Sequence, residues 1–283
     1  MNTSMKIINT HGHLWANSDI DRLIEEWKEE GVIKFCALAL GIKFQELGYL
    51  GNEGVGKWMR KYPDMIVGIG NIETGPNPDP VKKVEQLYNE GFKGLKFISP
   101  AKNYNDESYF GYYEKASELG MPIIFHTGIV ASTSGESQPE YNVNAEHMRP
   151  YHFDKICRMF PDLKIISAHL GTPHEKEAIC VAMKYKNVYY DFCGASGSKM
   201  WVSEIKKILA PFPGANMDDP DENVAKQYFR KFVFGTDNPP VRVWKRNSED
   251  IMDYLKIDYE TRQDFYWRNA AKIFNWTELL CSK

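Results

Sequence analysis

Two histidines separated by one glycine, His11 and His13, have the residue type and the spacing to do chemistry together. They follow Lys6–Thr10, a short apolar run that favours a strand. Side chains two apart on a strand point to the same face, so both imidazoles could face one ion. Gly12 would let the backbone between them lie close. The motif alone is a weak signal, because a single histidine after a strand is more often a hydrogen-bonded structural group.

Three further side chains of the metal-binding type end predicted strands. They are His126, His169 and Asp237, at the ends of Pro122–His126, Lys164–His169 and Phe232–Thr236. In a parallel barrel, reactive groups gather at the carboxyl ends of the strands, so the joint pattern predicts one site. Imidazoles and a carboxylate suit one divalent ion, and we expect zinc, with manganese as the alternative. Asp237 could instead shape a turn before proline, and Asp191 could support the site or serve packing.

The elements that must position these side chains follow one rhythm of short strands and amphipathic helices. The other predicted strands are Lys34–Ala39, Met65–Asn71, Phe92–Ile98 and Asn187–Phe192. The predicted helices include Asp19–Glu30, Asp79–Glu90, Glu107–Leu119, Tyr151–Phe160 and Pro173–Tyr185. Eight strands with helices between them predict a (β/α)8 TIM barrel, a single domain over residues 1–283 with its metal site at the carboxyl ends of the strands. The alternative fold is a doubly wound open sheet, but no phosphate-binding glycine motif occurs, and we assign Gly51, Gly54 and Gly56 to a turn.

Composition and charge exclude several classes of function. The net charge of -3 and the lack of a basic, aromatic-rich stripe argue against nucleic-acid binding. No run of about 18 apolar residues favours a membrane span or a signal segment, so we expect a cytoplasmic protein. The five cysteines lack a Cys-x-x-Cys motif and are predicted to be free thiols.

Short motifs over nearly the whole chain are similar to those of one enzyme family. They are Ile8-Asn9-Thr10-His11-Gly12-His13, Gly94-Leu95-Lys96-Phe97, Pro122-Ile123-Ile124-Phe125-His126-Thr127-Gly128, Ala168-His169-Leu170-Gly171, Phe234-Gly235-Thr236-Asp237-Asn238-Pro239 and Arg268-Asn269-Ala270-Ala271-Lys272-Ile273-Phe274. With these motifs the chain resembles the amidohydrolase superfamily, and within it the amidohydrolase-related branch, also called amidohydrolase 2.

The resemblance implies a distorted (β/α)8 barrel with one divalent metal, commonly zinc. The residues that match the family's metal ligands are His11, His13, His126 and Asp237. His169 matches the histidine that sits beside the metal-bound water, so the resemblance implies that His169 and Asp237 are catalytic. Lys96 matches a lysine that is carboxylated and bridges two metals in binuclear relatives. Because this branch usually holds one metal, we expect a salt bridge or a substrate contact for Lys96, with bridging as the alternative.

Two residues depart from the family pattern. Asn9 stands where the family usually has Asp, so a charge beside the metal site is missing. Thr10 stands where decarboxylases acting on aromatic acids have Glu, which disfavours that subgroup but leaves other decarboxylases open.

The ligand set predicts a metal-dependent hydrolase acting on a small ester, lactone or amide of a carboxylic acid. A non-oxidative decarboxylase or a hydratase of a small acid has the same ligands and is the alternative; a non-catalytic ligand-binding barrel is the second alternative. The residues expected to contact the substrate are Lys96, Trp15, Arg149 and Arg242. The expected partner is a small molecule rather than a nucleic acid or a membrane, and the family suggests a homodimer.

Overall fold

Seven parallel strands, in the order β1 to β7, form one sheet in the described part of the chain. The computed structural model describes residues 5–74, 79–130, 144–194, 197–211, 213–219, 222–238 and 240–281. The strands are β1 Ile7–Gly12, β2 Val32–Leu38, β3 Ile66–Asn71, β4 Gly94–Phe97, β5 Ile123–Phe125, β6 Ile165–Ser167 and β7 Val188–Tyr190. Each lies within one of the predicted segments or overlaps it, and the parallel sheet with alternating helices confirms the predicted fold class.

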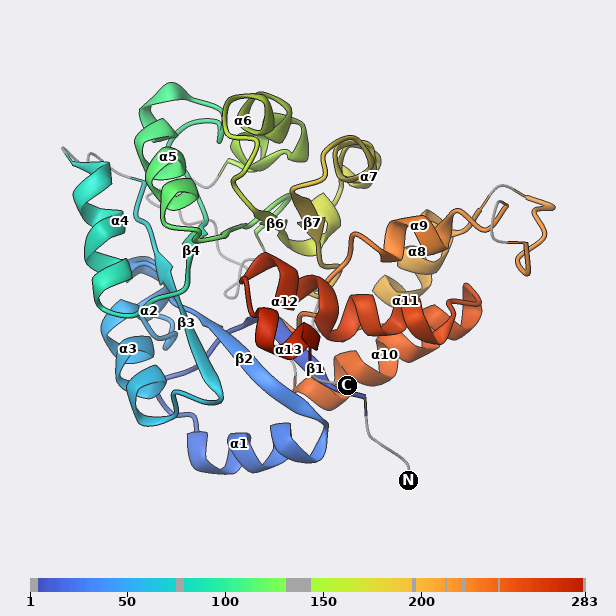
Figure 1. Ribbon diagram of the computed structural model, residues 1–283, viewed down its shortest axis with the longest axis horizontal. Helices are drawn as coiled ribbons and strands as arrows, with labels where there is room; N and C mark the ends of the chain where they lie inside the picture. The colour runs from blue at the N-terminus through green and yellow to red at the C-terminus, as the bar shows by residue number, and fades with distance from the viewer. Residues whose placement is uncertain are drawn as a thin grey trace.

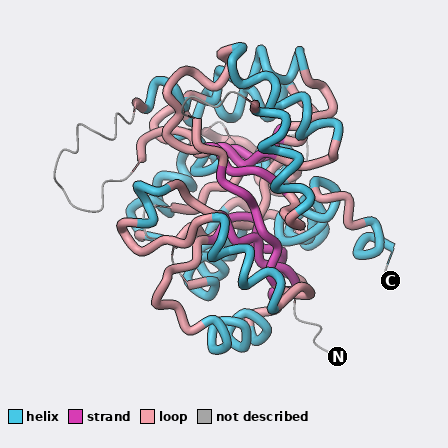
Figure 2. Tube along the Cα trace, turned by 90° about the vertical axis from the view of Figure 1, so that its left-hand side faces the viewer, coloured by secondary structure: helices cyan, strands magenta, loops and turns pink. Residues whose placement is uncertain are grey.

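Helices follow the strands and lie around the sheet (Figures 1 and 2). They are α1 Ile20–Glu29, α2 Ile42–Gln45, α3 Asn52–Lys61, α4 Pro80–Asn89, α5 Phe110–Glu118, α6 Phe153–Met159, α7 Glu175–Lys184, α8 Lys199–Leu209, α9 Ala225–Phe229, α10 Val241–Tyr254, α11 Tyr259–Gln263, the π-helical η7 Asp264–Arg268, α12 Asn269–Ile273 and α13 Thr277–Cys281. Local sequence explains several helix starts; the carboxylate of Asp19 caps α1, and Asp79 caps α4 just before Pro80. None of the described helices is long and apolar enough to cross a membrane.

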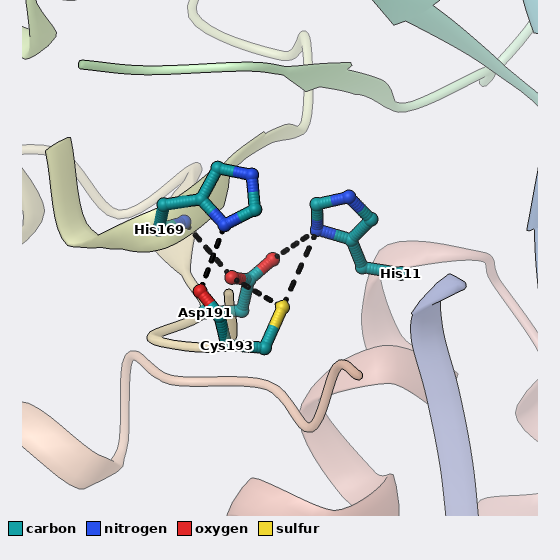
Figure 3. A group of neighbouring side chains, drawn as sticks. All are labelled: His11, His169, Asp191 and Cys193. Carbon is teal, nitrogen blue, oxygen red and sulfur yellow. Dashed lines mark hydrogen bonds and ion pairs between the residues drawn. The ribbon is translucent and has the colours of Figure 1, made fainter. Parts of the chain in front are cut away.

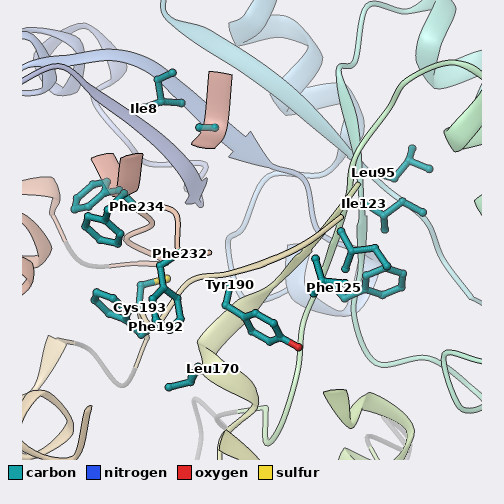
Figure 4. Close-up of a cluster of buried hydrophobic side chains, with 14 of the residues drawn as sticks. Ile8, Leu95, Ile123, Phe125, Leu170, Tyr190, Phe192, Cys193, Phe232 and Phe234 are labelled. Carbon is teal, nitrogen blue, oxygen red and sulfur yellow. The ribbon is translucent and has the colours of Figure 1, made fainter. Parts of the chain in front are cut away.

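Because side chains alternate between the two faces of a strand, the buried apolar residues form two clusters, one on each face of the sheet. One includes Leu95, Phe125 and Ile165 together with helix residues, so it fills the space between the sheet and the helices (Figure 4). The other is made mainly of strand residues such as Ile124 and Ile166, which therefore face the inside of the curled sheet. Lys96 is the register partner of Ile124 and shares that inner face.

The segment predicted as the eighth strand joins β7 to β1 but is not a regular strand, and this corrects the prediction. It forms isolated bridges, at Phe232 with Tyr190 and at Asp237 with Gly12. Its backbone still hydrogen-bonds to both neighbours, since Val233 N donates to Tyr190 O at 2.8 Å and Thr10 N donates to Phe234 O at 2.9 Å. The ladder is broken because Phe234 N donates to Phe265 O in η7, at 3.0 Å.

The glycines assigned to a turn belong instead to a helix. Gly51 is the residue before α3, and Gly54 and Gly56 lie inside it. Packing of Val55 and Met59 in the core stabilises this helix despite its glycines. A Cβ at Gly54 would lie 2.9 Å from the side chain of Leu50, so glycine allows close packing there.

Candidate metal centre and active site

The end of β1 presents both histidines of the His-Gly-His motif to one point. His11 is fully buried, and its Nδ1 lies 2.9 Å from Asp191 Oδ2. His13 Nδ1 lies 3.1 Å from Leu38 O. A carboxylate and a carbonyl accept hydrogen bonds, so each Nδ1 donates, and Nε2 is the ring nitrogen that both histidines present to the site. Gly12 is required between them, because a Cβ there would lie 2.2 Å from the ring of Phe35.

Asp237 completes a group of three from the opposite end of the chain. Its Oδ1 lies 3.4 Å from His13 Nε2 and 3.7 Å from His11 Nε2. Burial opposes ionisation of Asp237, but the hydrogen bond with His13 and the charges of His169 and His11 outweigh it and hold the carboxyl pKa well below its usual range. The ligand atoms of the three residues lie within 4.8 Å of one another.

The ring of His11 carries an observation that points to a cation. Its Nε2 is buried without a hydrogen-bond partner in the described part of the chain. Burial and the charge of Lys96 lower the pKa of His11 to about 4, so the ring is neutral at neutral pH and its Nε2 is an acceptor. Two imidazole nitrogens and one carboxylate oxygen, with the Nε2 of His11 unsatisfied, fit a divalent metal such as zinc. The residues therefore fit the ion that the sequence predicts.

A second group, His11, His169, Asp191 and Cys193, supports the first (Figure 3). Asp191 Oδ1 accepts from the backbone N of His169 at 2.9 Å and from Cys193 Sγ at 3.1 Å, while Oδ2 accepts from His11. Burial and the neighbouring Asp191 raise the pKa of the Cys193 thiol well above its usual value, so Cys193 donates as a thiol. These hydrogen bonds account for the group, which holds His11 and His169 in place.

His169 and His126 form the other side of the site. His169 Nδ1 donates to Cys193 O at 2.8 Å, which leaves its Nε2 as an acceptor. Its ring centroid lies 5.0 Å from that of His11 and 4.7 Å from that of His126. The structure therefore brings His126 beside His169 but not into the group of His11, His13 and Asp237. His126 Nε2 lies 3.4 Å from Ile129 O.

Strained backbone marks the same rim. Four residues other than glycine follow strand ends and have positive φ angles: Ser99 (50°), His169 (64°), Leu170 (51°) and Asp237 (58°). Such conformations persist in folded proteins where the surroundings impose them, often at functional sites. Two of the four are the residues predicted to be catalytic.

Lys96 lies buried on the inner face of the sheet. Its Nζ has no hydrogen-bond partner among the described residues. Burial lowers its pKa to about 8, although the charges of Asp191 and Asp237 act in the opposite direction. A buried amine without a hydrogen-bond partner is available to bind a ligand at the candidate site.

Of the predicted substrate contacts, Trp15 lies beside the site. Its ring packs against that of Tyr49 at a tilt of 32°, with centroids 3.9 Å apart, and Tyr49 meets the ring of His13 edge-on at 5.5 Å. The sequence analysis missed Tyr49, which lies in a stretch without a recognisable pattern.

The two arginines differ. The guanidinium of Arg149 pairs with Glu146 and Glu177. Arg242 is exposed in the first turn of α10, five residues after Asp237.

The two departures from the family pattern fasten the segment after β7 to β1. Asn9 Nδ2 donates to Thr236 Oγ1 at 2.8 Å, and Thr10 Oγ1 donates to Phe234 O at 2.9 Å. Asn9 and Thr10 are both buried, and because their side chains are neutral, neither presents a charge to the site. Their role in this structure is to set the position of Asp237 relative to His11.

Comparison with known proteins agrees with this architecture. A TIM-barrel protein from Bordetella bronchiseptica, described as uncharacterized, is 18% identical with a TM-score of 0.66, over 91% of this chain and 83% of that one. A probable 2-pyrone-4,6-dicarboxylic acid hydrolase from Acinetobacter baumannii, with citric acid bound, is 12% identical with a TM-score of 0.63, over 96% and 100%. A 5-carboxyvanillate decarboxylase from Novosphingobium aromaticivorans, complexed with manganese and a nitrobenzoic acid, is 15% identical with a TM-score of 0.56, over 90% and 79%.

At these identities the structures show a shared fold. No curated protein matches the sequence. The sequence profile described as "Amidohydrolase" matches residues 38–276, which is most of the chain and includes His126, His169 and Asp237. The match begins after His11 and His13, whose place in the site depends on the geometry above. The chain belongs to the amidohydrolase family.

Proposed function

We propose that this protein is a hydrolase that depends on one divalent metal and acts on a small ester, lactone or amide of a carboxylic acid. The observation that carries the proposal is the buried, unpartnered Nε2 of His11, which faces His13 and Asp237. Those three residues would hold the metal, with zinc as the first expectation and manganese as the alternative. When bound, a divalent ion there would polarise a carbonyl and make water a better nucleophile.

His169 is the proposed proton carrier. Because Nδ1 is committed to Cys193 O, Nε2 is the atom that can take a proton from water and return it to the leaving group. Asp191 keeps the backbone of His169 in its strained conformation. Asp237 has the second catalytic role, since its carboxylate lies beside both imidazole Nε2 atoms and can accept a proton as well as bind metal.

The groups proposed to bind the substrate surround this centre. Lys96 offers a buried amine, Trp15 an aromatic wall and Arg242 an exposed guanidinium close to Asp237 in sequence. Arg149 is engaged by two glutamates, so we assign binding of a substrate carboxylate to Arg242 instead. The proposed partner is one small molecule; a homodimer stays a prediction that light scattering on purified protein would test.

Decarboxylation or hydration of a small acid is the second candidate. Its support is the manganese-containing decarboxylase of the same fold. Against it, Thr10 is buried in a hydrogen bond to Phe234 O, at the position where decarboxylases of aromatic acids have a carboxylate. Hydrolysis therefore remains the first proposal.

Two measurements test the proposal. Elemental analysis of the purified protein is expected to find about one divalent ion per chain. Removal of the ion by a chelator should abolish turnover, and zinc or manganese should restore it. Full activity in metal-free protein would overturn metal dependence.

A substrate screen separates the two reactions. Lactones, esters, amides and small carboxylic acids are incubated with the metal-loaded enzyme, and acid release and carbon dioxide release are followed in parallel. Acid release without gas supports hydrolysis. Carbon dioxide evolved from any acid, and absent with an Asp237→Asn control, would replace hydrolysis by decarboxylation.

A further inference from the structure

A small two-stranded ribbon lies above the ends of β1 and β2. The chain after His13 pairs with the chain before α3, through Leu50 N to Leu14 O at 2.9 Å and Ala16 N to Gly48 O at 2.8 Å. Trp15 and Tyr49 form the antiparallel bridge of this ribbon. Their rings pack closely at a tilt of 32°, and the Tyr49 side chain is buried, with 8% of the residue exposed.

Tyr49 contacts both ends of the metal-binding group. Its ring meets that of His13 at 82° with centroids 5.5 Å apart, an edge-to-face arrangement. Burial and, after it, the charge of Asp237 raise the pKa of Tyr49. A hydrogen bond that the Tyr49 hydroxyl oxygen accepts from Asn238 acts in the opposite direction and is outweighed. Asn238 Nδ2 in turn lies 3.2 Å from Asp237 Oδ2 and donates to it.

The two histidines of the motif differ in the contacts that hold their rings in place. His11 is fully buried and held by Asp191, with Cys193 Sγ 3.6 Å from the same Nδ1. The one hydrogen bond found for His13 in the described part of the chain, apart from its contact with Asp237, is to Leu38 O. Two rings meet the ring of His13 edge-on, that of His11 at 5.3 Å and that of Tyr49 at 5.5 Å, and Tyr49 is the one of the two that lies outside the group of three.

We propose that Tyr49 is a positioning residue that keeps His13 and Asp237 at the separation a metal ion requires. This inference rests on the proposed function. Its ring acts on His13, and its hydroxyl acts on Asp237 through Asn238. Tyr49 thereby joins a ligand from β1 to one from the segment after β7.

The experiment measures metal affinity rather than turnover alone. Metal-stripped wild type, Tyr49→Phe and Tyr49→Leu are titrated with zinc and with manganese against a chromophoric chelator. Loss of a group that orients a ligand costs about 10- to 100-fold in metal affinity, which we expect for Tyr49→Leu. Tyr49→Phe keeps the ring and loses the hydroxyl, so we expect a loss of only a few-fold.

The matched control is Phe44→Leu. Phe44 packs edge-on against Tyr49 with ring centroids 6.3 Å apart, so it supports the ribbon without taking part in the contacts to His13 and Asn238. We expect its metal affinity to stay within about twofold of wild type. An equal loss in Phe44→Leu and Tyr49→Leu would overturn the proposal, because a general loosening of the ribbon would then explain both.

A spectroscopic measurement removes the dependence on one variant. In protein with 15N-labelled histidine, the Hδ1 proton of His13 bonded to Leu38 O should be visible in wild type and Tyr49→Phe. It should broaden or vanish in Tyr49→Leu; if that variant does not fold, Tyr49→Met takes its place. Unchanged metal affinity and an unchanged signal would overturn the inference while leaving the proposed function intact. Wild type that binds no metal would overturn both.

Discussion

On the side of β1, ligand atoms of two imidazoles and one carboxylate converge within 4.8 Å, whereas on the side of β5 and β6 the imidazoles of His126 and His169 lie next to each other, with ring centroids 4.7 Å apart. The first side takes its residues from the two ends of the chain, and its Nε2 atoms face inward. On the second side His169 is held by Asp191 and Cys193, and His126 Nε2 lies 3.4 Å from Ile129 O. The contrast fits the proposed roles, in which the first side binds the metal and the second transfers protons.

The largest effect is expected from Asp237→Asn. This substitution keeps the side-chain shape but removes the negative charge between His11 and His13. We expect metal affinity and turnover to fall by at least about a thousandfold, since charge stabilisation by the ion is worth several kcal/mol. Elemental analysis and turnover measure it, and the melting temperature shows that the fold persists.

His126→Asn is the matched control for that comparison. Because His126 lies outside the group of three, its loss should cost far less metal affinity. Equal losses in the two variants would show that the two sides share the ion and would break the comparison.

The next effect is expected from His169→Asn. Removal of a general acid–base group costs about 10²- to 10⁴-fold in turnover, while metal content should remain as in wild type. His174→Asn, at the start of α7, serves as a histidine outside the site and should behave as wild type. Loss of metal in His169→Asn would place His169 among the ligands.

Lys96→Met is expected to raise stability and lower activity. Below pH 8 both the folded and the unfolded chain carry this proton, so the folded chain bears the full cost of a buried cation. With the pKa lowered from 10.5 to about 8, that cost is roughly 3 kcal/mol. Urea unfolding of metal-stripped protein should show a gain of that order at pH 7.

The pH dependence of Lys96→Met provides the check on sign. In wild type the folded chain loses the proton first, so the free energy of unfolding should rise between pH 8 and 10.5. The variant should lack this rise. A less stable variant at pH 7 would mean that Lys96 has a partner outside the described residues.

The smallest effect concerns the two arginines. Arg242→Ala should raise KM several-fold for an acidic substrate with little change in kcat, because it removes one charge from the rim. Arg149→Ala breaks a surface ion-pair group of modest energy and should change KM less than twofold. A larger KM effect at Arg149 would reverse our assignment of the carboxylate contact.

Much of the fold could be predicted because the strands are short apolar runs that end in polar groups. Ile123–Phe125 and Ile165–Ser167 lie where the pattern predicted them. The irregularity of the segment before Asp237 could not be predicted, since it depends on Phe265, a residue far along the chain. Helix α3 was missed because its glycines favour a turn and its stability comes from tertiary packing.

The candidate site, like the fold, could be predicted from the sequence only in part. The strand-end rule identified His11, His13 and Asp237, and the structure brings these three together. The same rule identified His126, which the structure places beside His169, and its role as a metal ligand stays a prediction. Tyr49 and Cys193 were missed as functional residues, since an aromatic ring and a thiol have no distinctive spacing until the fold places them beside a histidine.

The hydrogen bond from Asn9 to Thr236 joins residues 227 positions apart. A ribosome that has made only the first half of the chain has produced both histidines of the motif but not Asp237. Closing so long a loop costs about 5 kcal/mol of chain entropy, which only a finished domain can offset. Tight metal uptake should therefore await completion of synthesis, which protects the nascent chain from capturing the wrong ion. The number of metal ions per chain in a preparation would then measure the fraction of its molecules that are correctly folded.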